Sequence, residues 1–224
     1  WGECYNIETT TFLNFSYQEG SDYPPLSGEI PSEIGQLVNM TDLFLGGNEL
    51  TVIPPEIGNL VNLQSLYLYE NLFTSIPSEI GNLVNLRTLD ISDNQITGEI
   101  PFEIGNLTNL NFLNLSNNLL SGFIPESICI LDWNYSMIHN NQLCPPYPEC
   151  IENFVGYQDT SECEEPSLCN EETEVELWGE CYNIEETTEL LVFYEEGPIP
   201  PEIGNLINLE LLNLDENELT GQIP

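Results

Sequence analysis

The chain has 224 residues, and its 38 acidic residues against a single basic one, Arg87, give a formal net charge of −37. Proteins use Lys and Arg to bind nucleic acids and anionic membranes and to clamp phosphate groups, so the composition argues against all three functions. It is nevertheless 41% hydrophobic and only 17% charged, which is enough apolar material for a folded core. No run of 18 apolar residues occurs, so no membrane insertion is predicted.

The chain begins at Trp1, without a Met or a signal peptide, and we therefore expect a processed product or a fragment. After residue 29 a repeat of 23 or 24 residues takes over, following the pattern IPxEIGNLxNLxxLxLxxNxLTGx. Its copies start at the Ile-Pro pairs of Ile30, Ile53, Ile76, Ile100, Ile124, Ile199 and Ile223. One copy cannot bury its apolar face alone, so the copies are expected to stack as the coils of a solenoid.

Each copy predicts two short elements. Leu89-Asp90-Ile91 alternates apolar and polar residues, which indicates a strand with one buried face. The segment Pro-x-Glu-Ile-Gly-Asn-Leu starts with a Pro and ends near a Gly, as a short helix or 3₁₀ turn does. An Asn follows the strand at a constant offset, and stacked side chains of this kind can bond to the turns above and below them. We expect a structural Asn ladder of Asn48, Asn71, Asn94, Asn118, Asn141 and Asn217.

Over residues 30–143 and 199–224 this pattern resembles the leucine-rich repeat family, and the IPxEIGNL and LTGxIP portions resemble its plant-type subclass. The resemblance implies an α/β solenoid. Short parallel strands would form its concave face, and 3₁₀ or short helices and turns its convex face. Plant-type relatives serve as receptor ectodomains and inhibitors.

A second, longer period divides the chain. Residues 1–20 return as residues 178–197, an offset of 177, and the second copy then lacks eight residues. The expected organisation is an N-terminal cap with the first strand (1–29), a repeat array (30–143), a Cys-rich C-terminal cap with an acidic junction (144–177), a second N-terminal cap (178–198) and the start of a second array (199–224).

Seven cysteines accompany these caps. Trp178-Gly-Glu-Cys181 and the segment 143–150 resemble the Cys-containing caps of plant-type repeat proteins, and the resemblance favours a Cys169–Cys181 bridge. Two bridges would then join Cys129, Cys144, Cys150 and Cys163, with three pairings open. Disulfide-tied caps imply an extracellular, secreted or cell-surface location. The spacing is not C-x-x-C, so no metal site is predicted.

Cys4 is left over from these pairings. Its expected partner, Cys169 shifted by 177, falls before residue 1, which agrees with a fragment, and an intermolecular bridge through Cys4 is the alternative.

The strand residues that point away from the core form the expected binding surface. Aromatic and polar side chains of this kind suit a protein partner or a sugar ring. The candidate binding residues are Tyr17, Phe44, Tyr67, Tyr69, Glu70, Asp90, Asp93, Asn114 and His139. Ser92 and Ser116 are expected on the same surface. Cross-strand stabilisation of the sheet is the alternative role of Phe44 and Tyr67.

No catalytic residues are predicted, because no nucleophile, base and orienting group occur together. The Glu residues of the IPxEIG segments, at positions such as Glu33 and Glu56, are expected to form a solvated row. No cofactor is predicted, and Ca²⁺ at Asp90 and Asp93 is a weak alternative whose spacing matches no calcium loop. The favoured function is a non-enzymatic scaffold that binds a protein or glycan. The alternative is a subunit that associates with copies of itself, end to end, into a filament or surface assembly.

Overall fold

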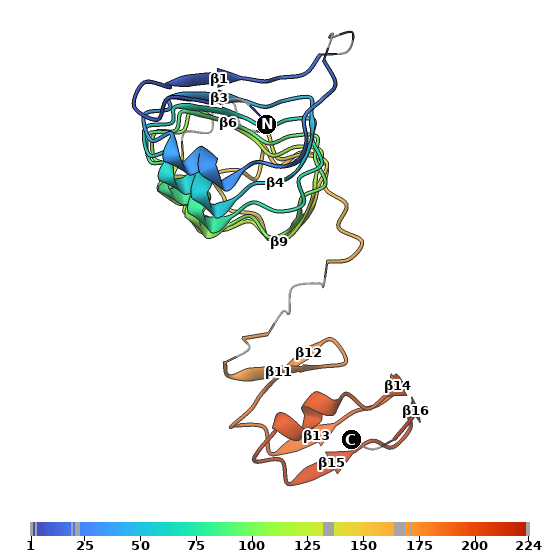
Figure 1. Cartoon of the computed structure of the whole chain (residues 1–224). Coiled ribbons are helices and arrows are strands. Elements are labelled where there is room, and N and C mark those ends of the chain that lie inside the picture. Colours follow the sequence, from blue (N-terminus) through green and yellow to red (C-terminus); the bar gives the residue numbers. More distant parts are fainter. Residues whose placement is uncertain are drawn as a thin grey trace. The chain divides into compact units, whose positions relative to one another are not determined.

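The computed structural model describes residues 2, 4–18, 20, 23–131, 137–163, 169–170 and 172–222. The chain forms two compact units, Trp1–Cys163 (the N-terminal unit) and Glu164–Pro224 (the C-terminal unit). Figure 1 shows the first as a stack of coils, and the second as a hairpin followed along the chain by a shorter set of the same elements. Within the described residues, no helix is long and apolar enough to cross a membrane.

One parallel sheet runs the length of the N-terminal unit, in the order β1-β3-β5-β6-β8. Its strands are β1 (Phe12–Asn14), β3 (Asp42–Phe44), β5 (Ser65–Tyr67), β6 (Thr88–Asp90) and β8 (Phe112–Asn114). The repeat sets the register, because the central Leu of each strand pairs with the central Leu of the next. These leucines are buried while their neighbours face outward, as the alternation predicts.

Other strands lie on a different side of the coils. β2 (Ser27–Glu29) pairs with β4 (Glu49–Val52), and β7 (Thr97–Gly98), β9 (Leu119–Phe123) and β10 (Gln142–Cys144) form a small parallel sheet. The pairing of β2 with β4 contains a register shift between Gly28 and Glu29. Gly98 and Gly122 have φ values of 79° and 75°, a left-handed conformation that glycine adopts without a Cβ penalty.

The IPxEIGN segments form 3₁₀ helices, each following a proline. In the N-terminal unit they are η1 (Ser32–Gln36), η2 (Pro55–Asn59), η3 (Ser78–Asn82), η4 (Phe102–Asn106) and η5 (Glu126–Ile130). Their glycines serve close packing between coils. A Cβ on Gly58 would lie 2.6 Å from the carbonyl oxygen of Glu79 in the next coil. The 3₁₀ helices can therefore stack directly on one another.

Residues 144–163, which we call the closing segment, cover the end of the N-terminal unit. Ile151 and Val155 are buried against the last coil. The disulfide Cys129–Cys150 ties this segment to η5, and Cys144–Cys163 joins the two ends of the segment. They are one of the three pairings that the sequence left open.

The C-terminal unit starts with an antiparallel hairpin of β11 (Glu174–Leu177) and β12 (Glu180–Asn183). Cys169 is bonded to Cys181 beside this hairpin, the pairing that the resemblance favoured. Parallel pairs β13 (Glu189–Leu191) with β15 (Leu211–Asn213) and β14 (Glu196–Pro198) with β16 (Glu218–Thr220) follow, with η6 (Pro201–Asn205) between them. These elements repeat the coil architecture of the first unit.

Candidate functional site

The six asparagines of the predicted ladder, which we call the inner Asn series, bind the backbone of two coils each. Asn71 donates from Nδ2 to the carbonyl oxygens of Leu45, Leu68 and Tyr69, and its Oδ1 accepts from the N–H of Leu50. Asn94, Asn118 and Asn217 repeat this arrangement in their own coils. Because these side chains are hydrogen-bonded to the backbone of two coils, the inner series stabilises the scaffold.

Gln158 continues the inner series into the C-terminal segment. Its Nε2 donates to the carbonyl oxygens of Ile138 and Val155, and its Oε1 accepts from the N–H of Leu143. This residue was not predicted from the sequence. The signal was present, because Gln158 follows Val155 at the same three-residue offset as Asn48 follows Leu45.

A second row of asparagines runs along the outside of the coils, and we call it the outer Asn series. Each member donates to a carbonyl oxygen of the preceding coil, for example Asn62 to Val38 at 2.9 Å and Asn85 to Val61 at 2.8 Å. The series consists of Asn39, Asn62, Asn85, Asn109 and Asn208. This row was not predicted from the sequence either, although an Asn recurs at this offset in every one of these copies.

The outward side of the sheet β1-β3-β5-β6-β8, which we call the strand face, carries a continuous line of aromatic rings. Phe12 meets Phe44 with ring centroids 5.4 Å apart, and Phe44 meets Tyr67 at 5.0 Å. Tyr67 meets Tyr69 at 6.4 Å, and all three contacts are edge-to-face. Such contacts contribute about 0.5–1.5 kcal/mol each and hold the rings in place. The rings therefore form a fixed apolar surface across three strands.

A hollow lies beside this line of rings. Its volume is about 630 Å³, and its lining includes Tyr17, Glu49, Tyr69 and Glu70. Three predicted binding residues, Tyr17, Tyr69 and Glu70, thus meet at one place. The hollow combines aromatic rings with carboxylates, which suits a partner with apolar and cationic groups.

Farther along the strand face the side chains are acidic and then amide. Asn117 donates to Asp93 at 2.9 Å, and Asn140 donates to Asn117 at 2.7 Å. These three residues and Glu70 have left-handed backbones, with φ between 50° and 56°. Asp90 accepts from the hydroxyl of Ser92, and Asn114 accepts from Ser116 in the same way. The acidic and amide groups are thus fixed by their neighbours, but they remain on the outward side.

Three residues on this surface differ from the sequence-based expectation. Ser92 and Ser116 were assigned to the binding surface, yet they are only 4% and 3% exposed because the side chains of Asp90 and Asn114 turn over them. His139 is half-buried, because Gly156 of the closing segment packs against it so tightly that a Cβ there would lie 2.6 Å from the His139 Cβ. His139 therefore offers less surface than its repeat position suggests.

Within the described part of the chain, no group of three or more His, Cys, Asp or Glu side chains has the arrangement of a metal site. Glu33, Glu56 and Glu202 are exposed, and Glu79 and Glu103 are half-buried. They occupy the first turns of their 3₁₀ helices, one per coil.

Comparison with known proteins identifies the family. A profile described as leucine-rich repeat region matches residues 56–132. No curated protein matches the sequence.

Solved structures of plant receptor ectodomains do resemble the chain. The leucine-rich repeat ectodomain of SOBIR1, a receptor kinase from Arabidopsis thaliana, is 30% identical with a TM-score of 0.50, and the match covers 62% of this chain and 72% of that one. HAESA from Arabidopsis, solved with the peptide hormone IDA and the co-receptor SERK1, is 30% identical with a TM-score of 0.56, and the match covers 88% and 33%. GASSHO1/SCHENGEN3 from Arabidopsis thaliana, solved with CASPARIAN STRIP INTEGRITY FACTOR 2, is 32% identical with a TM-score of 0.53, and the match covers 88% and 21%.

The chain thus spans about a fifth of one of these ectodomains and a third of another. The structure has one parallel strand per coil and 3₁₀ helices after the Ile-Pro pairs from Ile30 to Ile199. These features and the matches agree with the family that the repeat pattern indicated. The chain belongs to the leucine-rich repeat family, in its plant-type subclass.

Proposed function

We propose that the protein is a non-enzymatic extracellular scaffold that recognises a protein through the strand face. The observation that carries the proposal is the line Phe12–Phe44–Tyr67–Tyr69 ending at the hollow of Tyr17 and Glu70. Rigid aromatic side chains supply much contact area at little entropic cost, and they dominate many protein interfaces. The three disulfides support an oxidising, extracellular location.

The expected ligand is an extended peptide segment with apolar and basic residues. A net charge of −37 attracts basic segments and repels acidic ones. The related ectodomains of HAESA and of GASSHO1/SCHENGEN3 were solved with a peptide hormone and with CASPARIAN STRIP INTEGRITY FACTOR 2, respectively, which supports a peptide-like partner. A glycan that stacks on the rings is the alternative ligand on the same surface.

Selection from a displayed library of random peptides tests the proposal. Peptides selected on the wild-type chain are expected to bind the Tyr67→Ala/Tyr69→Ala variant at least about 10-fold more weakly, since buried aromatic anchors contribute about 2 kcal/mol or more. The matched control is Tyr157→Ala, an exposed tyrosine in the closing segment that should leave binding unchanged. Equal binding by the wild-type chain and the double variant would rule out the strand face as the binding surface. Binding on a glycan array, with no peptide selected, would favour the glycan.

End-to-end assembly is a second candidate, supported by the open side of β15. Leu212 occupies the core position of its strand but is 43% exposed, and Ile207 and Leu211 are exposed beside it. A further coil would bury these residues, and in a head-to-tail contact, which does not close, another copy of the chain would supply that coil. Electron microscopy with and without Ca²⁺ tests this, because divalent cations screen the acidic surfaces. Monomers in both conditions would exclude assembly.

A further inference from the structure

One coil of the N-terminal unit carries an acceptor motif for N-linked glycosylation where its neighbours do not. Residues 106–108 read Asn-Leu-Thr, whereas the same place reads Asn-Leu-Val at 59–61 and at 82–84. The change of one Val to Thr therefore creates the motif. Three further motifs lie in the described residues, at Asn14, Asn39 and Asn114, and one at Asn134 lies outside them.

The backbone at residues 106–108 turns both polar side chains of the motif outward. Leu107 has φ −81° and ψ 55°, and the N–H of Thr108 donates to the carbonyl oxygen of Asn106 at 2.9 Å. These are the features of an inverse γ-turn. Leu107 is fully buried, while Asn106 and Thr108 on either side of it are exposed. The apolar residue of the motif thus fixes the direction of the two polar ones.

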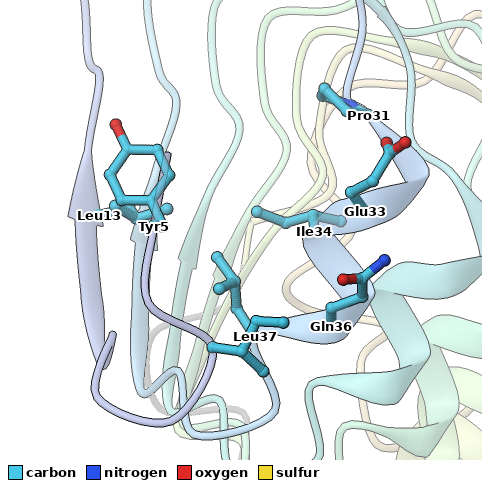
Figure 2. Close-up of a pocket in the computed structure, with 8 residues that line it drawn as sticks. Tyr5, Leu13, Pro31, Glu33, Ile34, Gln36 and Leu37 are labelled. Atoms are coloured by element: carbon cyan, nitrogen blue, oxygen red, sulfur yellow. The ribbon is translucent and has the colours of Figure 1, made fainter. Parts of the chain in front are cut away.

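The first coil shows how a side chain at this place is directed. Gln36 stands there in the place of Asn106, and the residue after it has the same backbone angles, φ −81° and ψ 55°. In Figure 2 Ile34 points towards Leu13, while Gln36 points away from both. A side chain at this place is therefore directed out of the coil.

The Asn106 side chain has free space around it. A groove of about 1060 Å³ runs along the outer side of the coils, and its lining includes Asn106, Thr108 and the exposed Val84. Within the described residues, the side chains of Asn106 and Thr108 make no hydrogen bond. The amide nitrogen that would carry a sugar and the hydroxyl that the motif requires are thus both open to solvent.

The other described motifs use their carboxamides in the fold. Nδ2 of Asn39 donates to the carbonyl oxygen of Glu8 at 3.0 Å. Oδ1 of Asn114 accepts from both the N–H and the hydroxyl of Ser116, whose side chain is buried. Oδ1 of Asn14 accepts from the backbone N–H two residues later. Asn106 is therefore the acceptor at which a glycan replaces no hydrogen bond of the folded chain.

We propose that the turn after η4 presents Asn106 as an N-glycosylation site. Glycosylation requires passage through the secretory pathway, so it rests on the extracellular location in the proposed function. It does not depend on ligand binding at the strand face, since Asn106 lies in the groove on the outer side of the coils.

The covalent step is the transfer of an oligosaccharide from a polyisoprenyl diphosphate donor. The bond between the anomeric carbon of the first sugar and the phosphate oxygen breaks, and a bond from that carbon to Nδ2 of Asn106 forms. The lipid diphosphate leaves with the bonding electrons, and one Nδ2 proton goes to a base of the transferring enzyme. Nothing is oxidised or reduced.

The experiment uses the full chain behind a cleavable secretion signal, expressed in insect cells. The signal supplies the location, so the result concerns the site alone. Chymotrypsin cleaves after Phe102 and Phe112, which places Asn106 and Asn114 on different peptides. Mass spectrometry of these peptides from the secreted protein measures the occupied fraction of each motif. We expect Asn106 to be occupied more fully than Asn14, Asn39 and Asn114. Occupancy at Asn106 no higher than at any one of these would overturn the proposal.

An exchange between two coils provides the matched control. Thr108→Val restores the Asn-Leu-Val of the neighbouring coils, and Val84→Thr creates the motif at 82–84, where Leu83 has the same turn with φ −80° and ψ 53°. Both changed side chains are exposed, so the urea midpoint of the double variant Thr108→Val/Val84→Thr should equal that of the wild-type chain. The glycan should move from Asn106 to Asn82. An Asn82 left without a glycan would contradict the assignment of the site to this turn.

Discussion

The ring of Tyr69 packs directly on Gly46 of the preceding coil: a Cβ on Gly46 would lie 2.5 Å from two ring carbons. Gly46→Ala should therefore displace the ring from the hollow and cost about 1–3 kcal/mol, the usual range for overpacking. Urea unfolding measures the loss. In the Tyr69→Ala background the same substitution should cost little, and equal costs in both backgrounds would show that the two residues are not coupled.

The inner Asn series should matter more than the outer one. Asn71→Ala removes three donated bonds and one accepted bond at a buried site, and should lower the free energy of unfolding by about 2–4 kcal/mol. Asn62→Ala removes one exposed bond and should cost about 1 kcal/mol or less. Urea midpoints of the two variants give the comparison. A larger loss for Asn62→Ala would contradict it.

The 3₁₀ glycines should be needed only where a following coil packs on them. Gly58→Ala brings a Cβ within 2.6 Å of a backbone oxygen of the next coil, and should destabilise the N-terminal unit by about 1–3 kcal/mol. Gly204 occupies the same place in η6, and a Cβ added there would meet no other described atom within 4 Å, so Gly204→Ala should be neutral or slightly stabilising. Thermal unfolding of both variants measures the two changes in stability, and equal changes would contradict the prediction.

The Cys144–Cys163 disulfide closes a loop with a sequence separation of 19. Replacing both cysteines by Ser should lower stability by about 3 kcal/mol, because the unfolded chain regains the entropy of that loop. Guanidinium unfolding measures the change. A loss well under about 1 kcal/mol would show that Ile151 and Val155 hold the closing segment without the disulfide.

Tyr182 should make the hairpin of β11 and β12 sensitive to alkali. Burial, and then the hydrogen bond to Glu180, raise the pKa of Tyr182 to about 12 from its usual 10.0. A raised pKa favours the neutral phenol in the folded state, so its stabilising effect is complete below about pH 10 and is lost as the pH rises towards about 12. An absorbance titration should show a late tyrosine that Tyr182→Phe abolishes. An unchanged titration curve in that variant would refute the assignment.

The architecture could be predicted from the sequence because the same residue pattern recurs in copy after copy. Leu43, Leu66 and Leu89 recur at fixed offsets, and only stacking can bury all of them. The Cys129–Cys150 pairing could not be selected, since it depends on which side chains the closing segment brings together. Ser92 was wrongly placed on the surface. The alternation of inward and outward residues along a strand cannot show that the Asp90 side chain accepts a hydrogen bond from the Ser92 hydroxyl and covers it. The aromatic residues of the strand face could be predicted one by one, but the packing of the Tyr69 ring on Gly46 could not.

The two Asn series also determine where the chain can tolerate a change in length. The interval from the Ile-Pro pair to the next inner Asn is always 18 residues for Ile30, Ile53, Ile76 and Ile100. From that Asn to the next Ile-Pro pair the interval is five or six residues. Both amide rows fall inside the constant interval, and Gly98 and Gly122 fall inside the variable one. Insertions made near Gly98 should therefore leave the hydrogen bonds of both Asn series in register. The segment around Gly98 is the natural place to graft a loop.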